Sequence, residues 1–201
     1  MVRRRTIGTL ARFGVVASCV PALLSGGPAT VHAQGAQAAT PEGKSGVAIV
    51  VMRPTAGHEA SGTVLIRDNG KGGVTLQISL ENLPAGTDHG FHVHEFGDCS
   101  APDASSAGPH YDPTHNMLGQ HQHGMKPLGD LEDLSAGPDG KVSRTFDAPS
   151  LSVSGENPIA GRGLLLHESA ADPSDPMSSA GARIACGVIG LRNPDEGAPA
   201  R

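Results

Sequence analysis

The chain has 201 residues, with four phenylalanines, one tyrosine and no tryptophan, so we expect one domain of ordinary size with extra terminal sequence. Its core should consist of Val, Ile, Leu and Ala, which suits β-strands, while 28 glycines and 16 prolines indicate frequent turns. The formal net charge is −5. It becomes −9 once residues 1–33, which contain four arginines and no acidic residue, are removed as a signal peptide. Such a charge argues against the basic surface that a nucleic-acid partner requires.

The N-terminus has the pattern of an export signal. Four arginines stand before an apolar run, Phe13–Leu24, which is followed by small residues. This predicts a secretory signal peptide over residues 1–33, cleaved after Ala33 or Ala38, because the run is too short and lacks the charged stop of a transmembrane helix. The protein is therefore expected in the periplasm or otherwise exported. The alternative is a lipoprotein anchored through Cys19, which lies in a segment that resembles a lipoprotein processing site.

The elements that follow indicate an all-β domain over residues 46–192, after a disordered leader at 34–45 and before a flexible tail at 193–201. Short runs of branched apolar residues alternate with turn-forming residues, and no window has a long helical stripe, which predicts an antiparallel sandwich or barrel. The expected strands are Val47–Met52, Gly62–Arg67, Val74–Leu80, Gly90–Glu95, Lys141–Phe146, Gly163–His167 and Ile184–Leu191.

Two segments between these strands, about 96–140 and 168–183, are irregular and rich in Gly, Pro and Asp. Long loops in a compact domain are usually functional. Cleavage of the signal peptide leaves Cys99 and Cys186 as the remaining cysteines. In an oxidising compartment two thiols indicate one disulfide, with a pair of buried free cysteines as the alternative.

Four histidines of the chain suggest a metal site. Strand alternation places His92 and His94 on one face, with Cα atoms about 7 Å apart, so that both imidazoles can bind one ion. Alone, such a pair is more often an ordinary polar strand face. His110 in a tight loop and His167 at the end of an apolar strand add two nitrogen ligands, and a four-imidazole set suits copper.

Five motifs in this order resemble the copper-zinc superoxide dismutase family, over about residues 46–191. Cys99, just after the histidine strand, resembles the bacterial periplasmic branch, which agrees with the export signal. The motifs are Gly90–Asp98, Ser106–His110, Gly129–Leu131, His167–Glu168 and Arg183–Gly190.

The resemblance implies a Greek-key β-barrel of immunoglobulin-like sandwich architecture with two long functional loops. Copper would be ligated by His92, His94 and His167, and His110 would bridge copper to zinc as an imidazolate. The implied substrate is superoxide: copper takes an electron from one superoxide, releasing oxygen, and passes it to a second, which leaves as hydrogen peroxide. His110, released from copper on reduction, would carry one of the protons.

The resemblance also assigns Arg183 as the active-site arginine, whose guanidinium is suited to holding a small anion beside the metal. A surface ion pair is the alternative. Cys186 lies three residues later, and its bond to Cys99 would fix the loop beneath Arg183. A disulfide that closes a long loop stabilises by roughly 2–4 kcal/mol.

The zinc half departs from the family pattern. Pro127 stands three residues before the expected aspartate ligand, where the family has a histidine, and the second histidine position falls on Leu118 or Gly119. In the other loop Ala171 stands where the family has an aspartate that links the two metals, so Asp172 would have to substitute. That loop has no lysine, so steering of superoxide should be weak. The zinc ligands we expect instead are His110 and Asp130, with His123 and His121 and, less favoured, His115.

Three functions fit these residues. A dismutase with a rearranged zinc site is favoured, and a dismutase active with copper alone comes second. The third is a periplasmic copper-binding or copper-buffering protein on the same scaffold, which the anion-holding Arg183 disfavours because storage needs no such residue. The protein partners compatible with this reading are a second copy in a homodimer and a copper donor protein, and we expect no transmembrane helix.

Overall fold

The computed structural model describes residues 46–113, 126–171 and 180–193. All of them belong to one unit, Pro41–Arg201. The predicted signal peptide (1–33) and leader (34–45) lie outside the described residues, as does the predicted tail apart from Asn193. None of the helices among the described residues has the length and hydropathy needed to span a bilayer.

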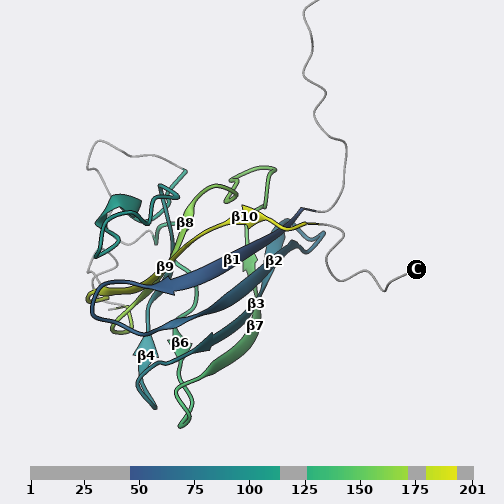
Figure 1. Ribbon diagram of the computed structural model, residues 1–201. Helices are drawn as coiled ribbons and strands as arrows, with labels where there is room; N and C mark the ends of the chain where they lie inside the picture. Colours follow the sequence, from purple (N-terminus) through teal and green to yellow (C-terminus); the bar gives the residue numbers. More distant parts are fainter. Residues whose placement is uncertain (1–45, 114–125, 172–179, 194–201) are drawn as a thin grey trace, which may run out of the picture. The chain divides into compact units, whose positions relative to one another are not determined.

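The described residues form an eight-stranded antiparallel sheet that curls around a common core, in the order β5-β8-β9-β1-β2-β3-β7 with β10 paired to β1, and a second sheet of β4 and β6 (Figure 1). The strands are β1 Val47–Pro54, β2 Ser61–Asp68, β3 Gly73–Glu81, β4 Asp88–His89, β5 Phe91–His94, β6 Leu134–Ser135, β7 Val142–Pro149, β8 Gly163–His167, β9 Arg183–Val188 and β10 Gly190–Leu191, with one 3₁₀ turn, η1, at Ser105–Ala107.

Neighbours that are not consecutive in the chain give the fold its crossovers: β3 pairs with β7, β5 with β8, and β1 with β9. This topology confirms the all-β class and fits a Greek-key barrel. The strand β1 joins the two halves of the long sheet, because Val47–Met52 pairs with β2 while Arg53 and Pro54 pair with β9.

The predicted strands are all present, with one correction. The run Ile184–Leu191 forms two strands, β9 and β10, and the intervening Ile189 donates its N–H to the carbonyl of Arg162 instead of continuing the ladder. The strands β4 and β6 were not predicted, since two residues are too short to show an alternating pattern.

The core is aliphatic along β1, β2 and β3, where buried and exposed residues alternate; Val50, Val64 and Ile78 face one another across the register. In β5 and β8, by contrast, every residue is buried. The barrel core covers one face of these strands. A second cluster of Ala104, Ala107, Leu165 and Cys186 packs at the other face. The histidine strand therefore lies in the interior, where an unpaired charge is costly.

Candidate metal centre

Four histidines from three separate segments of the chain converge beside β5 and β8. The nitrogen atoms that His92, His94, His110 and His167 can offer to an ion all lie within 4.8 Å of one another. Three of these side chains are buried, and His110 is 19% exposed. Of the described residues, these alone form a cluster of three or more metal-ligating groups.

Strand pairing explains the convergence. In the register of β5 with β8, His92 faces Leu165 and His94 faces Gly163, and strand alternation puts Gly163, Leu165 and His167 on one side of β8. All three imidazoles therefore lie on the same side of this strand pair, with Nε2 of His94 3.4 Å from Nε2 of His167. An isolated bridge pairs His94 with His110.

Hydrogen bonds occupy one nitrogen of two of the rings and leave the other free. The Nδ1–H of His94 donates to the carbonyl of Gly108 at 2.8 Å, and Nδ1 of His167 lies 3.4 Å from the carbonyl oxygen of Gly181. Their Nε2 atoms then face each other at 3.4 Å. Two unprotonated nitrogens at this distance have no hydrogen to share, whereas a cation can bind both.

In His92 the nitrogen available to an ion is Nδ1, whereas in His94 and His167 it is Nε2. Its Nδ1 is buried and is the one buried side-chain polar atom without a hydrogen-bond partner in the described part of the chain. The Nε2 end packs close to Gly90, where a Cβ would lie 3.3 Å from Nε2. An orphaned buried nitrogen beside two free Nε2 atoms is a donor set that a metal ion satisfies, and imidazole nitrogens suit copper.

The environment keeps these rings neutral, which is the form that binds metals. Burial, together with a smaller effect of the neighbouring histidines, lowers the pKa of His92 to about 2, that of His94 to about 3 and that of His167 to about 4. A cation at this position therefore does not compete with a proton at neutral pH.

His110 is paired directly with the expected zinc ligand Asp130, at 2.6 Å between Nδ1 and Oδ1. A tetrahedral zinc ion bound by both atoms would hold them about 0.7 Å farther apart. The pair would have to open to admit zinc. The other expected ligands, His115, His121 and His123, lie outside the described residues.

In the second loop Ala171 donates its N–H to the carboxylate of Asp133 at 3.4 Å. Asp172, the expected link between the two metals, lies outside the described residues. The proposed bridge through Asp172 therefore stays a prediction.

Arg183 lies beside the cluster because β9 is irregular. The register shifts between Leu166 and His167, so that Arg183 faces His167 and is re-aimed as bulges re-aim side chains. Its guanidinium donates to the carbonyls of Ala104 at 2.5 Å and Gly108 at 2.7 Å. Burial lowers the pKa of Arg183, while the nearby Asp103 raises it.

The carbonyl of Gly108 thus accepts from both His94 and Arg183. This residue has a φ of 74°, which favours glycine, and a Cβ there would lie 2.7 Å from the ring of Phe96. One backbone oxygen therefore sets the spacing between a metal ligand and the arginine.

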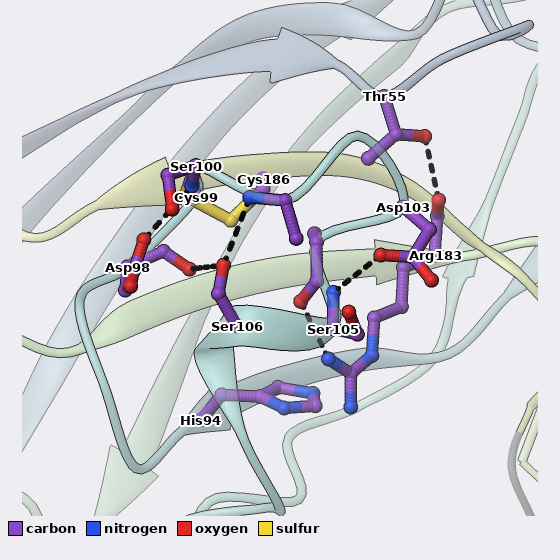
Figure 2. Close-up of a disulfide and its surroundings, with 12 residues drawn as sticks. Thr55, His94, Asp98, Cys99, Ser100, Asp103, Ser105, Ser106, Arg183 and Cys186 are labelled. Carbon is purple, nitrogen blue, oxygen red and sulfur yellow. Dashed lines mark hydrogen bonds between the residues drawn. A yellow bond between two sulfur atoms is a disulfide. The ribbon is translucent and has the colours of Figure 1, made fainter.

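The predicted disulfide between Cys99 and Cys186 is confirmed. Figure 2 shows it beside Arg183 and His94, with Ser106 below it donating its hydroxyl to the carbonyl of Asp98. The loop that carries Ala104 and Gly108 is therefore attached to β9 covalently.

Two residues near the centre were missed at the level of sequence. His89 is buried, its Nδ1–H donates to the carbonyl of His167 at 2.8 Å, and its Nε2 lies 2.7 Å from the hydroxyl of Thr87. Thr55 donates its hydroxyl to the carbonyl of Arg183 at 2.6 Å (Figure 2). In sequence, both lie among polar turn residues, and nothing there distinguishes them.

Comparison with known proteins agrees with this geometry. Residues 60–189 match the family described as copper/zinc superoxide dismutase. Proteins named superoxide dismutase [Cu-Zn] from Brucella abortus, Brucella melitensis and Brucella suis are each 41% identical to the chain over 148 residues, which covers 68% of the chain and 82% of each relative.

Proposed function

The chain belongs to the copper/zinc superoxide dismutase family, and on this premise we propose that it is an exported superoxide dismutase that converts superoxide to oxygen and hydrogen peroxide with a histidine-bound copper. The observation that carries the proposal is the pairing of a buried four-histidine cluster with an arginine whose guanidinium is held beside it by Ala104 and Gly108.

The residues that would hold copper are His92 through Nδ1, His94 and His167 through Nε2, and His110 through the nitrogen that Asp130 does not occupy. Copper bound there supplies one-electron chemistry, since it can take an electron from one superoxide and give it to another. The protein holds the neutral imidazoles of His92, His94 and His167 in place before any metal enters.

Arg183 and His110 are the catalytic residues of this proposal. The guanidinium of Arg183 attracts the superoxide anion and fixes it beside the cluster. His110 has its Nδ1 in a hydrogen bond with Asp130, so its Nε2, when it is not bound to copper, is the atom that would hold one of the two protons that peroxide needs. Its partial exposure lets that proton come from solvent.

The test is metal analysis of the purified protein after copper reconstitution, together with a superoxide dismutation assay. We expect one copper per chain and a rate proportional to copper content. Stoichiometric copper with a rate no higher than that of the metal-free protein would overturn the proposal and favour copper buffering.

For zinc we propose a site of His110 and Asp130 with His123 and His121, and with His115 as the less favoured ligand. The variants His121→Ala and His123→Ala should each lower zinc content while copper content stays unchanged. Unchanged zinc content in both would reject the assignment.

A dismutase active with copper alone is the second candidate, and the direct contact between His110 and Asp130 favours it. In that case the carboxylate holds the imidazole in the orientation that zinc would otherwise hold. Full activity at one copper and no zinc per chain would establish this candidate. Loss of activity on selective zinc removal would exclude it.

We further propose export to the periplasm, with the signal peptide at 1–33 and the folded domain at 46–192. The mass of the mature protein from a periplasmic extract distinguishes the two forms of export. Cleavage after Ala33 or Ala38 supports a free protein, and a lipid-modified Cys19 supports an anchored one.

The proposed partners are superoxide, a second copy in a homodimer and a copper donor protein. Sedimentation equilibrium of the copper-loaded protein tests the dimer. Copper transfer from a candidate donor to the metal-free protein, compared with uptake of free copper, tests the donor.

A further inference from the structure

We propose that Arg162 is a positioning residue that sets the distance between His94 and His110, by binding the residue that follows each of them. The inference rests on the proposed function, because it assigns Arg162 a role in the geometry of the copper site. Arg162 lies outside the cluster, and its side chain contacts Glu95, Pro158 and Tyr111.

Arg162 binds the residue after His94 through two oxygens. One of its terminal nitrogens, Nη1, donates to the carbonyl of Glu95 at 2.9 Å and to the carboxylate of Glu95 at 2.8 Å. The two side chains are 20% and 17% exposed. At this burial a charge-assisted hydrogen bond is screened less than at the surface.

The same guanidinium covers the residue after His110. Its central carbon lies 3.6 Å from the centroid of the Tyr111 ring, well inside the range of a cation–π contact. Tyr111 is 1% exposed, so the ring cannot move away without opening the core. One rigid planar group therefore touches both segments that carry the two histidines.

The position of Arg162 does not depend on either segment. Its Nε donates to the carbonyl of Pro158 at 2.8 Å, its N–H donates to the carbonyl of Ile159, and its own carbonyl accepts from Ile189. The residue is thus fixed on the turn that leads into β8. The same turn continues into β8, which ends at His167. Arg162 therefore fixes the positions of His94, His110 and His167 relative to one another.

Three backbone hydrogen bonds join the two segments: the N–H of Tyr111 donates to Val93, that of Glu95 to Pro109 and that of Phe96 to Ala107. Such hydrogen bonds keep their strength over a range of angles, so they tolerate a small tilt of one segment relative to the other. A planar guanidinium that is hydrogen-bonded to one segment and stacked on the other opposes such a tilt, and a lysine ammonium cannot do both.

The chain contains a matched control. Arg144 also pairs with a carboxylate, that of Glu132, and lies over an aromatic ring, Phe146, at 6.0 Å. Its side chain and that of Glu132 are 46% and 50% exposed, and Arg144 lies on β7, a strand that contributes none of the four histidines. Arg144→Lys therefore makes the same chemical change at an exposed pair, on a strand that carries none of the four histidines.

The experiment compares Arg162→Lys with Arg144→Lys in the full-length copper-loaded protein. We expect Arg162→Lys to retain stoichiometric copper, to change the hyperfine splitting in the Cu(II) electron paramagnetic resonance spectrum, and to lower the dismutation rate per copper by roughly three- to tenfold. Arg144→Lys should leave the spectrum and the rate unchanged.

Tyr111→Phe and Tyr111→Leu give a second comparison if Arg162→Lys does not fold. Phenylalanine keeps the ring under the guanidinium and should preserve the spectrum, whereas leucine removes it and should reproduce the altered spectrum. A wild-type spectrum in both Arg162→Lys and Tyr111→Leu would overturn the proposal, even if their thermal stability falls. Equal spectral changes in Arg144→Lys would overturn it too.

Failure of the proposed function gives a different result. If wild-type protein binds copper with four nitrogen ligands but does not dismutate superoxide, the enzyme proposal fails while the spectral comparison still tests Arg162. If the wild type is active and Arg162→Lys has the wild-type spectrum, only the positioning role fails.

Discussion

The proposed copper half and the proposed zinc half of the centre share His110, but they are built differently. On the copper side, His92, His94 and His167 come from paired strands whose register sets their positions. On the zinc side, the described residues supply only His110 and Asp130, which are bonded directly to each other. The remaining expected ligands belong to a loop segment outside the described residues.

This difference between strand ligands and loop ligands shows which metal ligands can be replaced from another position in the sequence. A strand ligand cannot shift by one residue without turning to the opposite face of the sheet, so the copper histidines must stay in one register. A loop ligand can be replaced from a nearby position. The departures from the family pattern at Leu118, Gly119 and Pro127 all lie on the loop side.

The largest effect is expected from removal of a strand ligand. His94→Ala should abolish stoichiometric copper binding and lower dismutation on the order of 100-fold or more, since loss of even an outer partner of a ligand costs 10- to 100-fold. His58→Ala, a histidine outside the four-histidine cluster, is the control. Copper content and activity close to wild type in His94→Ala would contradict the copper assignment.

A smaller effect is expected from the arginine. Arg183→Gln should keep its copper and lose about tenfold in kcat/KM, because the anion is no longer attracted and held. The rate should also become less sensitive to ionic strength. The control is Arg67→Gln, at an exposed arginine on β2, which should change neither quantity. An equal loss of kcat/KM in both variants would show that Arg183 acts only through the overall charge of the protein.

The disulfide should affect stability more than chemistry. Joint replacement of Cys99 and Cys186 by serine releases a cross-link between residues 87 positions apart, which should lower the free energy of unfolding by about 4 kcal/mol. Activity should fall about threefold, since the loop that holds Arg183 loosens. Urea denaturation of the metal-free protein measures the first quantity, and an unchanged midpoint would contradict it.

The smallest effect on copper is expected on the zinc side. Asp130→Asn keeps an oxygen that accepts from His110 but removes the charge, so copper content should stay unchanged and activity should fall by about twofold at most, while zinc content drops. Metal analysis distinguishes the halves directly. If copper is lost together with zinc, the two halves are not separable and the comparison fails.

Much of the fold was predictable from the sequence, because the pattern that marks a strand lies within the strand itself. Alternation in β1, β2 and β3 faces a single core, so their limits were close to those observed. The two-residue strands β4 and β6 and the break at Ile189 depend on partners distant in the chain. Local pattern contains no information about those partners.

The candidate centre divides in the same way. By itself the sequence indicated the four histidines of the cluster, through the spacing of His92 and His94 on a strand and through the family motifs that contain His110 and His167. It also predicted the disulfide between Cys99 and Cys186. Only the tertiary structure decided how they act together: Arg183 faces His167 through a shift in register, Gly108 accepts from an arginine and a histidine, and Arg162 bridges two segments. Each of these depends on the packing of residues distant in the chain, because a carbonyl or a guanidinium acquires its direction only when the strands around it are in place.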